Sequence, residues 1–288
     1  MRIIHWIVLS ICFVLPLSAL TETCYPLTAE PIDVVIPCCG KDLDTLELCI
    51  YGIRKHGKNI RRIIVVSKEK FTHSAEWFDE QNYPFSKETV ALELFHNNQT
   101  EATRFLSYPS SRIGWIYQQL LKLYAPFTIP GISANVLVLD ADVVFLNPVE
   151  FMTKKGEPYL TIAHEYHQPY FAHMERLLPG LKRVQASDSG VAHHMLFQYP
   201  ILNDLMQMIA HYHQTEPWKA ICRCIDHNHV HQSSFSEYEI YFNFALLRTK
   251  QAHTRSLSWI NSTTIDKKAL KGYKKQGVVY AACHSYNR

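Results

Sequence analysis

The sequence has no glycine-rich phosphate loop, because neither G-x-x-x-x-G-K-[ST] nor G-x-G-x-x-G occurs in its 288 residues. It also has no long block of like charge: 29 basic and 26 acidic residues give a formal net charge of +3. Without a basic arm, the chain is not expected to bind nucleic acid. If it binds a nucleotide, the phosphates must be held by something other than a glycine loop.

Internal repeats, low-complexity stretches and Pro/Gly/Ser linkers are also missing. We therefore expect residues 23–288 to form one domain, and a chain with 47% apolar residues is long enough for one sizeable α/β core. A disulfide framework is not expected. Of the eight cysteines, Cys12 lies in the leader described next, which leaves an odd number. One or two bridges remain possible in an oxidising compartment.

Residues 1–22 have the order of an export leader. Arg2 precedes an apolar run that continues to Leu20, and polar residues follow. The run approaches the roughly 20 residues that span a bilayer, so an uncleaved signal anchor is the alternative to a cleaved signal peptide. We favour cleavage. In either case the rest of the chain crosses the membrane, so we expect an exported or lumenal protein that contacts the membrane only through an uncleaved leader.

The first part of the expected domain predicts a βαβ unit. Ile32 to Pro37 is a β-branched run closed by proline, which indicates a buried strand. Asp42 stands at the N-cap of a helix whose apolar residues recur at helical spacing until Gly57. A second β-branched run covers 63–66, and a right-handed parallel connection is expected between the two strands.

Residues 68–111 are mixed in pattern, and we expect loops with short elements there. Helical spacing returns between Ile113 and Tyr124, where one apolar stripe runs along the segment. Gln118 and Lys122, four residues apart, share another face of this helix.

The strongest pattern is the run from Asn135 to Phe145, which is apolar except for Asp140 and Asp142. A charge in the middle of a covered parallel strand is costly unless it is paired, so both carboxylates are expected where the strand ends. Ligands of open α/β sheets bind at this edge. If the backbone stays extended, the i, i+2 spacing points both side chains the same way, and oxygen ligands suit Mg²⁺ or Mn²⁺. The alternative is a pair of turn carboxylates that cap backbone amides.

These segments resemble the GT-A glycosyltransferases. The run Leu-Asp140-Ala-Asp142 with its flanking apolar residues and Asn-Pro is similar to the D-x-D segment of the glycogenin-like and related families. Residues 33–39 look like the nucleotide-binding strand, and residues 114–123 resemble the helix before the D-x-D strand. The resemblance covers residues 31–150. It implies an α/β fold with a mainly parallel sheet and helices on both faces, a donor-binding half at 31–150 and an acceptor half at 151–288.

The resemblance also implies an activity. It predicts a transferase that moves a sugar from a nucleotide-diphosphate donor to a glycan, lipid or protein acceptor, with Mn²⁺ or Mg²⁺ at Asp140 and Asp142. A cation that bridges the phosphates stabilises the leaving group, which suits a chain without a glycine loop. A histidine near the C-terminus often completes the metal site in this family, and His284 ends a strand-like run there. The residues expected to contact the donor are Cys38, Asp42, Trp115, Gln118, Lys122 and Asp140.

A candidate for the catalytic base lies at the start of another helix. Ser236 and Glu239 form the pattern of a capping box, so helix initiation accounts for Glu239 unless it is itself the base. Glu237 has no such explanation, and a carboxylate at a helix N-terminus can accept the proton of an acceptor hydroxyl. Further candidates for contacts with the donor sugar or the acceptor follow the D-x-D strand in the chain: Asp188, His193 and His194. Asp188 is also a candidate catalytic residue.

A different class of function, transition-metal binding, is suggested by His227, His229 and His231. In an extended segment these alternate histidines would project from one face, as a zinc or copper site requires. We favour a solvated loop for them. The rival hypothesis is an exported, non-catalytic protein on a GT-A-like scaffold that binds carbohydrate or metal.

Overall fold

The structure is a computed structural model that describes residues 20–263 and 266–283. Most of the expected leader and the candidate ligand His284 lie outside these residues. In the described part, no helix is both long enough and apolar enough to cross a membrane. Six cysteines of the described part are free thiols: Cys24, Cys38, Cys39, Cys49, Cys222 and Cys224.

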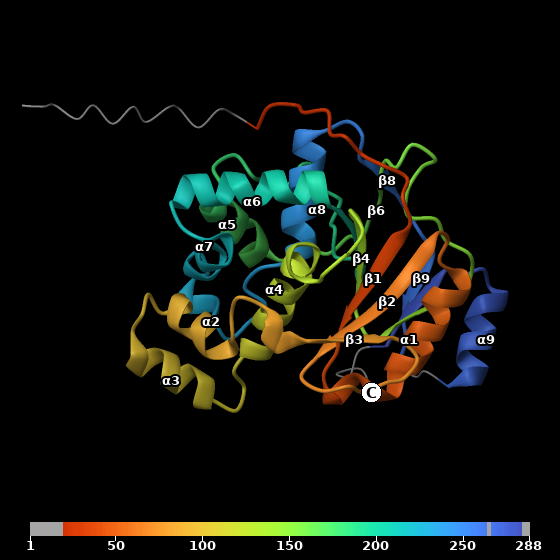
Figure 1. Cartoon of the computed structure of the whole chain (residues 1–288), viewed down its shortest axis with the longest axis horizontal. Coiled ribbons are helices and arrows are strands. Elements are labelled where there is room, and N and C mark those ends of the chain that lie inside the picture. The colour runs from red at the N-terminus through yellow and green to blue at the C-terminus, as the bar shows by residue number, and fades with distance from the viewer. Residues whose placement is uncertain (1–19, 264–265, 284–288) are drawn as a thin grey trace, which may run out of the picture.

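A five-stranded sheet forms the centre of the molecule (Figure 1). Three neighbouring pairs of strands run parallel, and only the last strand is antiparallel to its neighbour. In spatial order the strands are β3 (Glu76–Asp79), β2 (Ile60–Ser67), β1 (Ile32–Pro37), β4 (Asn135–Leu139) and β7 (His194–Gln198). The predicted mainly parallel α/β sheet is therefore confirmed, and β1 has the predicted bounds.

Helices cover both faces of this sheet, as predicted (Figure 1). One face packs on α1 (Leu43–His56), beside which lies α9 (Lys267–Lys275). Gly52 lets α1 approach closely, because a Cβ there would lie 2.8 Å from the Phe145 carbonyl oxygen. The other face packs on a larger group of helices: α2 (Lys87–Leu94), α4 (Ile113–Thr128), α5 (Gln168–Leu177), α6 (Tyr199–His213), α7 (Pro217–Arg223) and α8 (Glu237–Arg248).

Because β1 is sandwiched between these layers, its alternate residues enter different cores. Val34 and Ile36 pack with α1, whereas Val35 packs with the larger helical layer. All three side chains are buried. This two-sided burial explains why the strand reads as a continuous apolar run in the sequence.

Two smaller sheets complete the architecture. One joins β5 (Val143–Phe145), β10 (Tyr280–Ala282) and β9 (Trp259–Asn261), and the other pairs β6 (Tyr159–Thr161) with β8 (His253–Arg255). The apolar run 135–145 is thus split between two sheets. The split occurs at Asp140, whose carbonyl accepts a hydrogen bond of 3.1 Å from the Val143 amide and so closes a turn.

Residues 68–111 contain short elements, as predicted. Besides β3, the segment contains α2 and α3 (Gln99–Ser107). Each helix is only two turns long, so neither shows an apolar stripe long enough to stand out from one sequence. Ser86 and Thr89 form a capping box that starts α2, with threonine in the position where glutamate or glutamine is usual.

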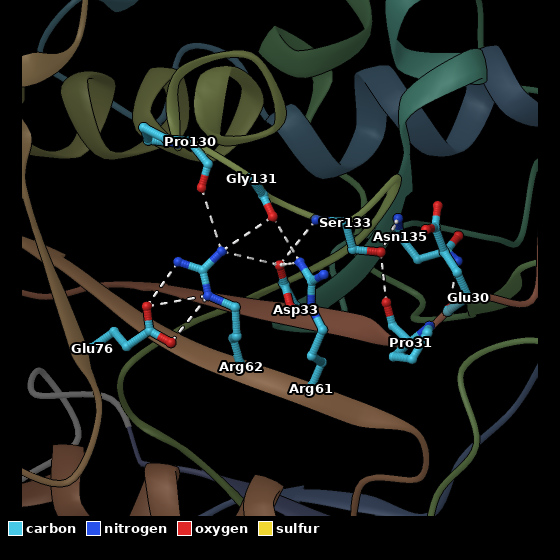
Figure 2. A network of polar contacts seen from close by, with 10 residues as sticks. All are labelled: Glu30, Pro31, Asp33, Arg61, Arg62, Glu76, Pro130, Gly131, Ser133 and Asn135. Atoms are coloured by element: carbon cyan, nitrogen blue, oxygen red, sulfur yellow. Dashed lines mark hydrogen bonds and ion pairs between the residues drawn. The ribbon is translucent and has the colours of Figure 1, made fainter.

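The amino end of the sheet is closed by a polar network around Asp33 (Figure 2). The buried Asp33 carboxylate accepts hydrogen bonds from Arg61 Nε at 2.9 Å and Nη2 at 2.5 Å, and from the Ser133 amide at 2.9 Å. Arg62 bridges from Asp33 to Glu76 on the next strand. The network fixes the start of β1 against β2 and the entry to β4.

Candidate functional site

At the opposite, carboxyl end of the sheet lies a polar cavity of about 270 Å³. Its walls include the turn after β4, residues of α4 and the start of α8, which are far apart in the sequence. A second cavity of about 360 Å³ adjoins it and reaches the end of β1. The two cavities share four wall residues: Lys41, Arg112, Trp115 and Gln118.

The ammonium group of Lys122 is the centre of the polar cavity wall. It lies 2.5 Å from Asp140 Oδ1 and 2.7 Å from Glu237 Oε1, and it donates to the Tyr238 hydroxyl at 3.2 Å. The lysine side chain is only 2% exposed, so its charge would be costly without these partners. One buried cation is therefore shared by two carboxylates that come from different elements.

Burial and pairing act against each other on these three groups. Burial alone would lower the pKa of Lys122, but the two carboxylates raise it above its usual value. Burial works to raise the pKa of Asp140, yet the Lys122 and His193 contacts keep it well below its usual range. For Glu237 burial is the stronger influence, and its pKa is raised despite Lys122. Glu237 is thus the more readily protonated of the two carboxylates.

Glu237 has further features of a proton acceptor. It is the first residue of α8, whose N-cap Ser236 accepts a hydrogen bond from the Glu239 amide. Its Oε1 is held by Lys122, while its buried Oε2 has no hydrogen-bond partner among the described residues. The residue lines the polar cavity, so an entering hydroxyl group could provide the missing donor.

Asp142 and His193 line the same cavity beside Asp140. The backbone turns between Asp140 and Val143, so the D-x-D segment is not extended, yet both carboxylates line one cavity. His193 Nδ1 lies 3.6 Å from Asp140 Oδ2. The His193 backbone has a φ of 64°, a left-handed conformation that is uncommon outside glycine and often found at functional sites.

The expected donor-side residues gather around the two cavities. Trp115 and Gln118 belong to both walls, Asp42 and Lys122 to the polar cavity, and Cys38 to the adjoining one. The Trp115 ring lies parallel to that of Tyr170 at 8°, with centroids 6.4 Å apart, and the Arg112 guanidinium lies 5.1 Å from its centre. This aromatic and cationic pair offers a surface for a flat, negatively charged ligand such as a nucleotide.

Three expected site residues lie outside both cavities. His194 is packed in the core against Phe145 and Tyr280 and hydrogen-bonds to Thr161, and burial lowers its pKa to about 3. Asp188 lies on a neighbouring loop with its carboxylate bonded to the Ser187 hydroxyl. These residues were expected at the site because they follow the D-x-D strand, but β7 turns His194 inward.

Glu239 is the third expected residue outside the cavities. Its carboxylate accepts hydrogen bonds from the Ser189 hydroxyl at 2.5 Å and from Asn243 at 2.9 Å, and its amide is capped by Ser236. The cap half of the expected capping box is therefore present. The Glu239 side chain bonds to the loop at Ser189 instead of returning to the cap, which is a structural role.

The histidine cluster does not form the expected extended face. His227–His229 is a 3₁₀ helix, so alternate residues point in different directions. His227 Nε2 is bonded to the Leu94 carbonyl oxygen at 2.7 Å. Within residues 20–263 and 266–283, no group of three or more His, Cys, Asp or Glu side chains is arranged to hold a metal ion.

Several wall residues of the polar cavity were not anticipated from the sequence. Arg112 and Ser233 are joined across 121 positions by a hydrogen bond of 3.0 Å, which no local pattern reveals. Tyr238 could have been predicted from the sequence, because it lies between the two candidate glutamates at the start of a helix. The unanticipated residues include Lys41, Arg112, Glu165, Ser233 and Tyr238.

The donor chemistry of the wall partly fits a hard divalent cation. Asp140 and Asp142 offer the oxygen ligands that Mg²⁺ and Mn²⁺ prefer. Lys122 already holds Oδ1 of Asp140, so a cation would have to use Asp142 and the other oxygen of Asp140. Such a cation needs further ligands from its substrate, from water or from a residue beyond the described part.

Fold and site together define an α/β protein with a polar, carboxylate-lined cavity at the carboxyl edge of a mainly parallel sheet. The chain belongs to a family of unknown function, DUF6492, whose model matches residues 29–282. No curated protein matches it. Among solved structures, mouse xyloside xylosyltransferase 1 in its apo form is similar over 90% of this chain and 99% of its own, with 10% identity and a TM-score of 0.41. At that level the likeness carries no argument about activity.

Proposed function

We propose that this chain is a GT-A glycosyltransferase that moves a sugar from a nucleotide-diphosphate donor to an acceptor hydroxyl. The observation that carries the proposal is the position of Asp140. It follows β4 directly, at the carboxyl edge of parallel strands, and it lines a cavity together with Asp142 and the expected base Glu237. Ligands of open α/β sheets bind at this edge, and the D-x-D resemblance predicts which ligand.

The adjoining cavities give the two halves of the donor separate places. The wall with Trp115 and Arg112 suits a nucleobase and its phosphates, because it combines a ring face with a guanidinium group. The reacting sugar then lies toward Lys122 and Glu237 in the polar cavity. This division accounts for a nucleotide site in a chain without a glycine-rich loop.

Glu237 is the proposed general base. Its raised pKa makes it a better proton acceptor than an ordinary exposed carboxylate, and its buried Oε2 has no hydrogen-bond partner among the described residues. Lys122 keeps Oε1 fixed by an ion pair of 2.7 Å, so the carboxylate is oriented before substrate enters. Nucleophilic attack of the acceptor oxygen on the sugar carbon breaks the bond to the diphosphate, and the proton passes to Glu237.

A divalent cation, Mn²⁺ or Mg²⁺, is part of the proposal. Asp142 and Asp140 Oδ2 would hold it, and when bound it supplies positive charge to the departing diphosphate. Lys122 would keep Asp140 ionised and in place for this contact. Both carboxylates line the polar cavity, where the diphosphate would lie.

A thermal-shift panel of nucleotide sugars, with and without Mn²⁺, tests the proposal. A matching donor at a concentration of 100 times its dissociation constant should stabilise the protein by about 2.7 kcal/mol. The stabilisation should be smaller without Mn²⁺. Gln118→Ala, in the wall shared by both cavities, should reduce the shift. The matched control is Gln276→Ala, on an exposed residue after α9, which should leave it unchanged.

Sugar transfer with the donor found in that panel separates the proposal from its rival. Turnover that requires Glu237 supports the transferase. Binding of sugars or metals without any turnover would instead favour the non-catalytic carbohydrate- or metal-binding protein.

A further inference from the structure

A third cavity, of about 470 Å³, lies outside the two described above, between α3 and the segment around His231. Its floor is apolar: Phe105 and Val230 are each 3% exposed. The His231 ring lies above this floor, with centroid distances of 5.4 Å to Phe105 and 5.2 Å to Tyr108. Tyr108 is 54% exposed, so a large ring face stands open at the cavity edge.

Polar side chains of α3 form the rim of this cavity. Asn98, Glu101 and Arg104 follow one another at successive turns and all line it. Together they offer an amide, a carboxylate and a guanidinium group, which both donate and accept hydrogen bonds. An apolar floor bordered by aromatic rings, with a rim of planar polar groups, matches a sugar, whose C–H face packs on rings while its hydroxyl groups bond to the rim.

Two chain segments connect this cavity with the candidate active site. Tyr108 precedes Arg112 by four residues, at most about 14 Å of extended chain. His231 precedes Ser233 by only two residues. Arg112 and Ser233 both line the polar cavity and are joined by a hydrogen bond of 3.0 Å. The short connections along both segments bring the two cavities within reach of one short oligosaccharide.

We propose that the aromatic cavity binds the distal sugars of an oligosaccharide acceptor whose terminal unit enters the polar cavity. The inference rests on the proposed function for the reaction at that terminal unit and names the acceptor class as a glycan. A metal ion is a poorer occupant, since His227 Nε2 is committed to the Leu94 carbonyl oxygen. A wholly apolar ligand is also a poorer occupant, since Glu101 and Arg104 border the opening.

The test is retention of the full-length protein on a glycan array of linear oligosaccharides of glucose, galactose, mannose, xylose and N-acetylglucosamine, with a peptide array in parallel. Tyr108→Ala should weaken retention about 3- to 10-fold, because it removes one aromatic ring on which a sugar can stack. The matched control is Tyr51→Ala, because Tyr51 on α1 is equally exposed at 56% and lines none of the three cavities. This control should be retained like the wild type, and all three proteins should bind UDP equally.

Kinetics give a second readout once a donor is known. Tyr108→Ala should raise KM for the oligosaccharide acceptor by a similar factor, with kcat and the donor KM unchanged. The inference is overturned if the wild type retains no glycan, if both tyrosine variants are retained alike, or if peptides are retained through Tyr108 instead. If the protein binds nucleotide but shows no Tyr108-dependent glycan binding, only this inference is contradicted. If it shows Tyr108-dependent glycan binding but binds no nucleotide, the proposed transferase activity is contradicted and the sugar site is retained.

Discussion

Both ends of the central sheet carry buried carboxylates, but the carboxylates at the two ends have different numbers of cationic partners. At the amino end, Asp33 receives two bonds from Arg61 and one from a backbone amide, and Arg62 continues to Glu76 (Figure 2). Two carboxylates there meet two guanidinium groups. At the carboxyl end, Asp140 and Glu237 share the single ammonium group of Lys122, and Asp142 lies beside them on a cavity wall.

The difference separates a structural network from a candidate site. Asp33 is fully enclosed, and both of its oxygens are engaged within the fold. In contrast, Glu237 lines a cavity, and its buried Oε2 has no hydrogen-bond partner among the described residues. Surplus negative charge around a cavity is costly to keep, so we expect it to be retained for a ligand rather than for stability.

The largest effect is expected on the rate of sugar transfer in Glu237→Gln. Glutamine keeps the size of the side chain but cannot take the proton, so transfer should slow about 10²–10⁴-fold while donor binding stays nearly intact. Single-turnover kinetics and calorimetry measure the two effects. Glu239→Gln is the matched control: it should cost about 1 kcal/mol of stability through its buried hydrogen bonds and leave the rate unchanged. The opposite pattern would make Glu239 the base.

The next largest effect is expected on stability in Lys122→Met. The change removes the one cation shared by Asp140 and Glu237, and breaking a buried pair in this way should lower the free energy of unfolding by about 3 kcal/mol. The matched control, Lys219→Met, removes a surface pair with Glu216 and should cost less than about 1 kcal/mol. Denaturant unfolding measures both, and equal losses would contradict the role given to Lys122.

The loss in Lys122→Met should also depend on pH. Burial already raises the pKa of Glu237 in the folded state, and loss of the ammonium group would raise it further. The folded variant then binds more protons than the unfolded chain, so its stability should rise as pH falls through the folded pKa. Unfolding at pH 8 and pH 5 should therefore show a smaller deficit at pH 5. An unchanged deficit would mean that Glu237 is not the destabilised group.

At the other end of the sheet, Asp33→Asn tests the structural network. The Arg61 side chain is 42% exposed and can turn to water, so we expect a loss of about 2–3 kcal/mol rather than the full cost of a stranded buried charge. Nucleotide binding should be unchanged, because the network closes the opposite edge. Glu76→Gln, in a half-exposed pair with Arg62, should cost under about 1 kcal/mol. Loss of nucleotide binding in Asp33→Asn would contradict the assignment of a purely structural role to the amino end of the sheet.

The sequence predicted the elements around the site better than the contacts within it. The strand Ile32–Pro37 and the stop of β4 before Asp140 follow from local patterns, since β-branched runs and buried charge leave little choice. The Lys122–Glu237 pair joins positions 115 residues apart, and helical spacing shows only that Lys122 lies on one face of α4. Such contacts arise from tertiary packing, which a single sequence does not display.

Two differences from the sequence analysis depend on where strands begin and end. His194 was assigned to the site as part of the polar cluster that follows the D-x-D strand, but it is the first residue of β7 and its side chain is buried in the core. The D-x-D segment would point both carboxylates the same way only if it were extended, and it is not. A turn at Asp140 sends the apolar residues after it into another sheet, and nothing in an uninterrupted apolar run marks where one sheet ends and the next begins.

Asp142→Asn, with the smallest expected effect on the fold, provides the most direct test of the central claim. Calorimetry with UDP and GDP, with and without Mn²⁺, on the wild type, Asp142→Asn and the matched control Asp188→Asn makes the measurement. We predict that Asp142→Asn weakens Mn²⁺ binding and Mn²⁺-dependent nucleotide binding while its stability is unchanged or rises, and that the control, outside the cavity, binds like the wild type. Nucleotide binding that needs no metal and that Asp142→Asn leaves unchanged would contradict the account.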